Sequence, residues 1–440
     1  MVFWLLTRTG HFYSQHGYCR GFNHQQKFSL VNVKLKWVKD KVLDEVVAGE
    51  REVRAASILV SIINRGCLPV YHLSGHRRLL GLPNDLKLST FVRRYPNIFY
   101  ETYNLDSGGT RVPWYCLTPE AFSLYQEEVN TLQCNQKYLL DRLCKLLMLT
   151  RERMLPVQTI DQLKWDLGLP YDYQQSLIPN NPDLFSLVQL PDDRVGLKLL
   201  SWDDRLAVSQ LQKNAGSQET EATNDGLAFP ISFTRGFGLK KKCMAWLQEW
   251  QKLPYTSPYS DASHLDPRTD VSEKRIVGVF HELLHLTVLK KTERRNVSNL
   301  RKPLSLPQKF TKVFERHPGI FYISKKNDTQ TVVLREAYAS RQLAQKDPLV
   351  DIREKFASMM REGLLARSRG LTTCIAEDAI VDTVRSAKFH CYSSTIGILP
   401  ASRSTLFYFP TTLLFISLLI VLILLVHKYI NIHSFGAFTL

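Results

Sequence analysis

Residues 80–102 read LGLPNDLKLSTFVRRYPNIFYET, and the same pattern returns twice further along the chain. The second copy, at residues 167–190, reads LGLPYDYQQSLIPNNPDLFSLVQL, and the third, at residues 304–324, reads LSLPQKFTKVFERHPGIFYIS. Each copy contains Leu-Pro, a stretch of helical character, and then Pro-x-[Ile/Leu]-Phe. Self-similarity of this kind indicates that one small folding unit occurs several times.

The residues that follow each copy predict a β-hairpin. Turn-forming residues separate two short apolar runs after Phe99, Phe185 and Phe321, which is typical of paired strands, and a helix is expected to resume afterwards. The proline ends the preceding helix, and the phenylalanine is expected to pack as the first core residue of the strand. The sequence therefore predicts an α+β fold, mostly helical, with three winged-helix-like helix–helix–β-hairpin units in tandem.

The charge of the chain favours a polyanionic partner. Its 440 residues carry 57 basic and 41 acidic side chains, a net charge of +16, and 44% of the residues are hydrophobic. This composition is typical of a globular protein with two or three domains, and the basic excess favours nucleic acid or an anionic membrane surface. The eight cysteines form no CxxC pair, so we expect reduced, mostly buried thiols rather than a zinc ribbon or an iron–sulfur site.

The two ends of the chain differ from the rest. No Asp or Glu occurs before Asp40, and the Arg-containing leader over residues 1–32 resembles an organellar transit peptide. The leader is not rich in Ser, which favours the mitochondrion, with the chloroplast as the alternative. Residues 405–426 carry no charge and are long enough to span a bilayer, as a possible transmembrane segment or as extra sequence appended to a soluble protein.

The domain boundaries follow from the repeats and from shifts in composition. Between the leader and the uncharged run, the sequence predicts four segments: units 1 and 2 over 33–208, a linker with a basic amphipathic insert over 209–270, unit 3 over 271–350, and a basic tail over 351–404.

Residues 281–285 read HELLH, which matches the zinc-peptidase signature H-E-x-x-H. That chemistry needs two histidines one helical turn apart, a glutamate base and a third ligand. The extended pattern H-x-x-G-x-x-H is absent, and a distant ligand such as Glu293, Glu315 or Glu336 stays open, although the last two belong to the third unit. The helix itself has one apolar stripe, which predicts burial: Ile276, Phe280, Leu283, Leu284 and Thr287.

We therefore expect no metal, no other cofactor and no enzymatic activity. The alternatives are a membrane-anchored zinc metallopeptidase that uses His281, Glu282 and His285, and a non-catalytic assembly factor of an organellar membrane.

Four blocks of sequence resemble the plant organelle RNA recognition domain, a family that includes the What's This Factor group. The blocks are KLKWVKDKVLDEVV at 34–47, LLGLP with FVRRYPNIFYE at 79–101, HELLHLTVLKKTERR at 281–295, and FERHPGIFYIS with VVLREAY at 314–338. The resemblance covers residues 33–350 and implies binding to organellar intron RNA, promotion of group II intron splicing as part of mRNA processing, and no peptidase activity. The second-half blocks and the leader indicate a mitochondrial member, with other splicing factors as further candidate partners. The resemblance offers no precedent for residues 405–426.

RNA binding requires basic groups for phosphates and exposed rings for base stacking. Four clusters combine these features: His76, Arg77 and Arg78; Arg93, Arg94 and Tyr95; Lys240, Lys241 and Lys242; and Lys290, Lys291, Arg294, Arg295, Arg301 and Lys302. Each cluster could instead be a solvated helix face. Trp246 and Trp250 are four residues apart on an amphipathic stretch, so we expect them to pack in the core rather than to stack on bases.

Overall fold

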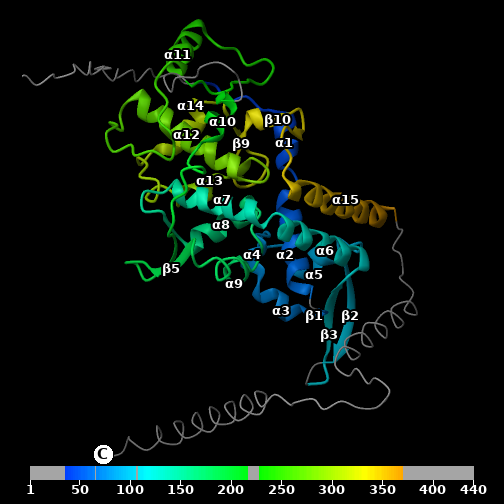
Figure 1. Cartoon of the computed structure of the whole chain (residues 1–440). Coiled ribbons are helices and arrows are strands. Elements are labelled where there is room, and N and C mark those ends of the chain that lie inside the picture. Colours follow the sequence, from blue (N-terminus) through cyan, green and yellow to red (C-terminus); the bar gives the residue numbers. More distant parts are fainter. Residues whose placement is uncertain (1–34, 65, 106–107, 217–226, 370–440) are drawn as a thin grey trace, which may run out of the picture. The chain divides into compact units, whose positions relative to one another are not determined.

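The computed structural model describes residues 35–64, 66–105, 108–216 and 227–369 (Figure 1). The predicted leader over 1–32 and the uncharged run over 405–426 lie outside these residues. Within the described ranges, no helix combines the length and the apolar character that crossing a membrane requires.

The first repeated unit contains a helix, a short strand, further helices and a hairpin. Its elements are α2 (Glu50–Ile63), β1 (Leu68–Pro69), α3 (Val70–Gly75), α4 (Arg77–Leu80), α5 (Leu88–Val92), β2 (Phe99–Leu105) and β3 (Arg111–Leu117). The three strands form an antiparallel sheet in the order β1-β3-β2. The first strand places Leu68 opposite Tyr115.

The second and third units repeat this order. The second contains α7 (Gln136–Met148), β4 (Met154–Pro156), α8 (Val157–Leu167), α9 (Tyr173–Ser176), β5 (Phe185–Gln189) and β6 (Val195–Leu199). The third contains α12 (Asp270–Leu286), β7 (Lys291–Glu293), α13 (Arg294–Ser298), η1 (Phe310–Lys312), α14 (Val313–Arg316), β8 (Phe321–Ser324) and β9 (Thr331–Leu334). Their sheets have the orders β4-β6-β5 and β7-β9-β8. The mixed fold with small antiparallel sheets is confirmed, while the likeness to winged-helix modules stays a prediction.

The Leu-x-Leu-Pro stretches mark equivalent turns in the three units. Gly81 and Gly168 each end a helix in the left-handed conformation, with φ of 64° and 69°, which glycine adopts without the steric penalty of a Cβ atom. In the third unit, Ser305 has the same kind of backbone, with φ of 52°. The following proline cannot continue a helix, so the chain turns there in every unit.

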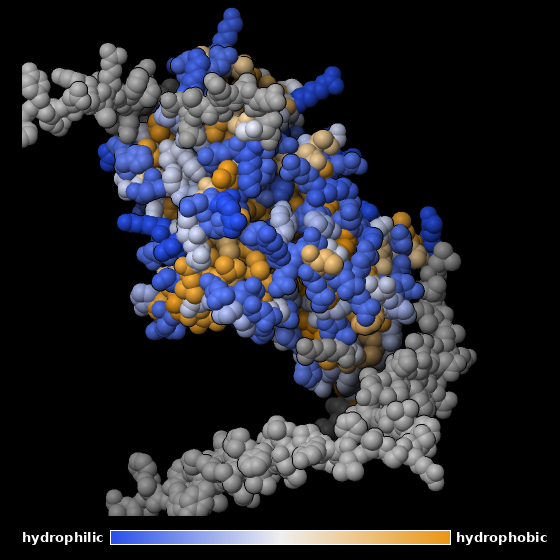
Figure 2. All heavy atoms as spheres, in the orientation of Figure 1, coloured by the Kyte–Doolittle hydropathy of each residue, from blue (hydrophilic) through white to orange (hydrophobic). Residues whose placement is uncertain are grey.

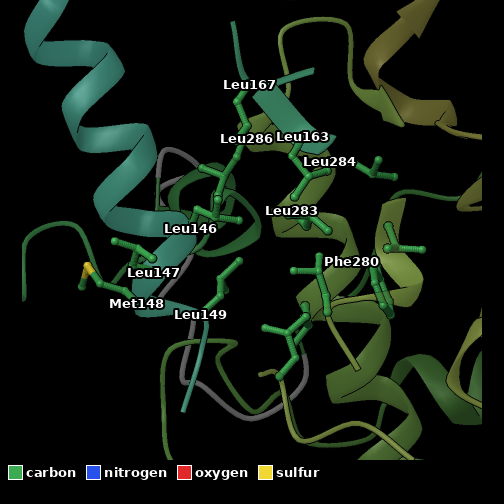
Figure 3. Close-up of a cluster of buried hydrophobic side chains, with 14 of the residues drawn as sticks. Leu146, Leu147, Met148, Leu149, Leu163, Leu167, Phe280, Leu283, Leu284 and Leu286 are labelled. Carbon is green, nitrogen blue, oxygen red and sulfur yellow. The ribbon is translucent and has the colours of Figure 1, made fainter. Parts of the chain in front are cut away.

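The predicted core residues are buried. Phe99, Phe185 and Phe321 are at most 3% exposed, as the repeat predicts. Units 2 and 3 share one hydrophobic core, in which leucines of α7 and α8 meet α12 (Figure 3): Leu146, Leu147, Leu163, Leu167, Phe280, Leu283 and Leu284. The predicted stripe of α12 is buried, but His281 and Glu282 are buried as well, each 1% exposed. That helix is therefore enclosed on more than one face.

The described residues of the segment 209–270 pack against this core and do not form a free linker. The segment contains α10 (Gln210–Gly216) and α11 (Lys241–Gln251). Five of its aromatic side chains are buried in the core that contains α12: Phe229, Trp246, Trp250, Tyr255 and Tyr259. The prediction that the two tryptophans pack in the core is confirmed.

A helix resumes directly after the first hairpin only. There α6 (Pro119–Cys134) begins at the N-cap Thr118. After the second hairpin, the Asp203 carboxylate accepts hydrogen bonds from the Arg205 backbone and side chain, and such local bonds compete with a helix. After the third, η2 (Arg335–Ala337) leads into the strand pair β10 (Tyr338–Ala339) and β11 (Gln342–Leu343). The expected continuation is therefore wrong for units 2 and 3.

The two ends of the described chain cross over to distant units. The N-terminal α1 (Lys41–Val47), capped by Asp40, packs against β8 of the third unit. There the Trp37 Nε1 donates to the Ile323 carbonyl at 2.9 Å, and the Tyr322 hydroxyl donates to Asp44 at 2.9 Å. The C-terminal α15 (Pro348–Ser368) packs against α6 and α2 of the first half (Figure 1). The start of the predicted basic tail is thus an integral helix of the fold.

The expectation of reduced thiols is wrong for one pair of cysteines. Cys67 and Cys116 form a disulfide between the first unit's β1 and β3 regions. Pairing of Leu68 with Tyr115 brings the two cysteines side by side. Among the described residues, Cys144 is a buried free thiol and Cys134 an exposed one.

Candidate nucleic-acid interface

Lys290 and Lys291, the first residues of the densest predicted basic run, point into the protein. The helix ends at Leu286, and the chain turns at Lys290, whose φ is 48°. The Lys290 Nζ donates to the carbonyls of His285 and Thr287 at 2.6 and 3.0 Å, and burial lowers its pKa to about 8. The Lys291 Nζ pairs with Glu50 at 2.7 Å. These two cations stabilise the fold and are not presented to a ligand.

Several other predicted residues are also engaged within the protein. Tyr95 is 1% exposed and packs edge-on against Phe91. Arg93 holds both carboxylate oxygens of Glu101 at 2.6 and 2.7 Å, which raises the arginine's pKa. Arg77 donates to three backbone carbonyls at the Leu-Pro turn: those of Pro83, Asn84 and Leu86. The first two clusters therefore supply fewer free cations than the sequence indicates.

Two further members of the densest run, Arg294 and Arg295, form ion pairs with neighbouring carboxylates. Arg294 pairs with Glu315 at 3.0 Å, and the exposed Arg295 pairs with Glu293 at 2.5 Å. Each of these charges is partly neutralised by its neighbour, and exposed pairs of this kind contribute little to stability.

Arg301 and Lys302 lie next to two cations that the sequence did not single out. The backbone N–H of Arg151, before β4 in unit 2, donates to the Pro303 carbonyl of unit 3 at 3.0 Å. Arg151, Arg153 and Lys302 are exposed, and Arg301 is half-buried. We call Arg151, Arg153, Arg301 and Lys302 the basic junction. Within the described residues, no carboxylate pairs with any of its four side chains.

Other predicted cations are exposed but more scattered. Arg78 lies on α4, and Lys240, Lys241 and Lys242 lie at the start of α11; all four are exposed. Arg94 is half-buried beside Tyr95. These groups add to the basic surface from elements other than those that carry the basic junction.

The three hairpins present different side chains to solvent. The first exposes Tyr103, 46% accessible, with the Arg111 guanidinium 4.5 Å from its ring centre. The second exposes Leu187 and Val195, and hydrophobic atoms gather over the region of β5 and α8 (Figure 2). The third is buried on both strands. Among the described residues of the three hairpins, the first therefore places an exposed ring of its own beside a cation, as base stacking requires.

A cleft of about 930 Å³ lies between α2, α6 and α8. The Arg353 guanidinium lies 3.7 Å from the centre of the Trp165 ring, and within the described part of the chain its Nε and Nη1 have no hydrogen-bond partner. Three cations and three carboxylates line the cleft, together with His76: Arg54, Lys164, Arg353, Glu128, Asp161 and Asp172. Because these formal charges cancel, the cleft lacks the electrostatic character of a phosphate groove.

The HELLH residues separate into two groups. His281 and His285 both direct Nε2 at Glu336 of η2. Burial raises the pKa of the Glu336 carboxyl, but the hydrogen bonds and charges of the two imidazoles outweigh it and lower that pKa to about 2. Glu282 instead binds the Lys145 ammonium at 2.6 Å and the Tyr259 hydroxyl at 2.7 Å. The glutamate of the signature is therefore already occupied.

Comparison with known proteins places the chain in a family. The plant organelle RNA recognition domain matches residues 38–365. The mitochondrial protein What's This Factor 9 of Arabidopsis thaliana is 37% identical over 372 residues, which cover 82% of this chain and 94% of that protein.

Other relatives match less closely. The chloroplastic What's This Factor 1 of Zea mays is 31% identical over 343 residues, which cover 75% of this chain and 68% of that protein. Root Primordium Defective 1 of Arabidopsis thaliana is 27% identical, over 73% of this chain and 82% of that protein. No solved structure matches. The predicted mitochondrial address, with the chloroplast as alternative, is confirmed by these relatives. The chain belongs to the plant organelle RNA recognition domain family.

Proposed function

We propose that this protein binds group II intron RNA in the mitochondrion and promotes its splicing, while the chemistry of bond breaking belongs to the RNA. Family membership supports an organellar RNA-related role. The net charge of +16 supports attraction to a polyanion. In this proposal, the repeated helix–strand–helix–hairpin units act as winged-helix-like modules that present basic groups at fixed positions.

The observation that carries the proposal is the basic junction. Its four cations come from two units, and the hydrogen bond from Arg151 to Pro303 joins those units at this point. Because no carboxylate neutralises these side chains within the described residues, they can bind phosphates without first breaking an ion pair. Phosphate contacts position a protein on RNA and make its affinity depend on salt.

The salt dependence of binding provides the test. We compare the wild type with the quadruple variant Arg151→Gln, Arg153→Gln, Arg301→Gln and Lys302→Gln, using a fluorescently labelled single-stranded RNA. Each phosphate contact contributes about 0.7 to the slope of log K against log salt for single strands. Loss of four contacts should reduce the slope by up to about 3.

A matched control removes the same charge from exposed cations that already have partners. Arg194, Arg205, Lys252 and Lys346 pair with Asp192, Asp203, Glu249 and Asp351. Replacing these four with Gln should leave the slope nearly unchanged. Equal losses in both quadruple variants would show that binding follows net charge alone, against a site at the basic junction.

The intron itself requires a test in the organelle. Crosslinking the protein in isolated mitochondria and sequencing the attached RNA should recover group II intron sequences. Plants that lack the protein should accumulate the unspliced form of the same transcripts. Recovery of RNA without introns, or normal splicing in those plants, would contradict the splicing role but leave RNA binding intact.

A further inference from the structure

Three potential metal ligands converge between α12 and η2. The Nε2 atoms of His281 and His285 lie 2.8 and 2.7 Å from the same Oε1 atom of Glu336. The two histidines are one helical turn apart, which places both rings on one face of α12. Among the described residues, this is the group of His, Cys, Asp and Glu side chains whose ligand atoms come close enough together to hold one ion.

Hydrogen bonding alone leaves this arrangement incomplete. Both imidazoles contact one carboxylate oxygen, while the second oxygen of Glu336 is buried and has no hydrogen-bond partner among the residues that the structure describes. A buried acceptor without a donor is unfavourable. A cation between the three side chains would interact with the whole carboxylate and with both ring nitrogens.

We propose that His281, His285 and Glu336 bind a zinc ion that fastens the central helix α12 to the segment after the third hairpin. Two imidazoles and one carboxylate are a donor set that zinc accepts, with a fourth position for water. The side chains of His285 and Glu336 are 13% and 12% exposed, which gives an ion and one water access from solvent.

The ligand atoms of the three side chains all lie within 4.8 Å of one another, and the two separations from histidine to Glu336 require only a small adjustment. Ligand atoms about 2.0–2.1 Å from a tetrahedral zinc ion lie roughly 3.3 Å apart. The hydrogen-bonded separations of 2.7 and 2.8 Å would therefore open by about half an ångström. Since η2 is a single short turn between β9 and β10, Glu336 can move by rotation of its own side chain.

The surroundings favour a structural ion over a peptidase centre. A peptidase needs the glutamate of H-E-x-x-H as a general base beside the metal. Both oxygens of Glu282 are occupied: Oε1 by Tyr259 and Lys145, and Oε2 by the backbone N–H of Gln210 at 2.6 Å. Glu282 is also 1% exposed. The ion would therefore stabilise the fold, because binding to the native state alone adds to the free energy of unfolding.

The test measures zinc on the full-length protein. The wild type is purified with zinc present, dialysed against metal-free buffer, and analysed by mass spectrometry for metal content. We expect one zinc ion per chain. His285→Gln and Glu336→Gln should each retain less than about one-tenth of it, since three protein ligands are needed for a stable site.

His317→Gln is the matched control. His317 is also buried, and its Nε2 lies 2.7 Å from the carboxylate of Glu273, which within the described residues receives no second imidazole. This variant should keep its zinc. If the ligand variants do not fold, cobalt substitution of the wild type still decides, because a tetrahedral site with nitrogen and oxygen ligands gives an intense visible spectrum that zinc abolishes.

Two results would overturn the inference. One is wild-type protein that retains no stoichiometric zinc and gives no tetrahedral cobalt spectrum. The other is zinc retained by both His285→Gln and Glu336→Gln. Hydrolysis of a peptide by the zinc-loaded protein, lost in Glu282→Gln, would overturn the structural assignment of the ion. RNA binding does not enter these measurements, so their failure leaves the proposed function untouched.

Discussion

Substitution of Gly168 by alanine should lower the free energy of unfolding for two separate reasons. Gly168 ends α8 with φ of 69°. A Cβ atom placed on it would lie 2.6 Å from Leu349 and 2.7 Å from Val288. Gly81 occupies the equivalent turn of the first unit with φ of 64°, and a Cβ atom there would meet nothing within 4 Å. The two glycines thus share the backbone conformation and differ in the space around them.

The two alanine variants should therefore differ in stability. A left-handed residue other than glycine costs roughly 1–2 kcal/mol, and this term applies to both Gly81→Ala and Gly168→Ala. Forcing an extra methyl group into a packed core costs about 1–3 kcal/mol more. We expect Gly81→Ala to lose about 1–2 kcal/mol and Gly168→Ala about 2–5 kcal/mol. The difference measures the contact of the second unit's turn with Leu349 of α15 and with Val288.

Equilibrium unfolding in urea, followed by circular dichroism, gives the comparison. With a slope of about 2 kcal/mol per molar urea, a difference of about 2 kcal/mol separates the two midpoints by about 1 M. Truncating Leu349 removes one of the two closest obstructing atoms and leaves Val288, so Gly168→Ala should cost roughly 0.5–1 kcal/mol less in the Leu349→Ala background. Equal losses for the two glycines, with no coupling to Leu349, would refute the packing argument.

Two further predictions concern buried charges. Burial, with a smaller contribution from Glu50, raises the pKa of Asp166 from 3.8 to about 6. The protonated Asp166 side chain therefore stabilises the folded state fully below about pH 3.8, and this stabilisation is lost as the pH rises through about 6. It amounts to at most about 3 kcal/mol. Asp166→Asn should flatten that part of the curve of unfolding free energy against pH, and an unchanged curve would contradict the assignment. Lys145→Met leaves the Glu282 carboxylate buried without its cation, so it should lose about 3–5 kcal/mol in urea unfolding. Adding Glu282→Gln should recover much of that loss, and a double variant no more stable than the single one would count against the pair.

The repeated pattern predicted the parts of the fold that depend on local sequence. Leu-Pro followed by Pro-x-x-Phe gave all three hairpins and the buried phenylalanines, because proline and turn residues act over a few positions. The repeated pattern did not predict the first strand of each sheet. For β1 and β4 the sequence does contain a shared motif, Leu68-Pro69-Val70 and Leu155-Pro156-Val157. In the third, β7 begins with Lys291 and gives no apolar signal at all.

The basic groups were harder to predict because their surroundings are not local. Lys290 and Lys291 resemble a solvated helix end, yet the left-handed turn at Lys290 directs both ammonium groups to carbonyls and to Glu50. The basic junction joins stretches that lie far apart in sequence, through the bond of Arg151 to Pro303. The disulfide depends in the same way on the register of β1 with β3. Such pairings need the tertiary structure.

The crossed ends of the described chain affect how it is assembled during synthesis. Because α1 packs against β8 and α15 packs against α2 and α6, each terminal helix contacts a unit that lies far from it in the sequence. During translation, α1 leaves the ribosome long before β8 has been synthesised. The hydrophobic surface of the first unit stays exposed until α15 has been synthesised and can cover it. A polypeptide truncated before residue 348 would therefore lack α15, and the hydrophobic surface of its first unit would stay uncovered. Chaperones would have to bind that surface.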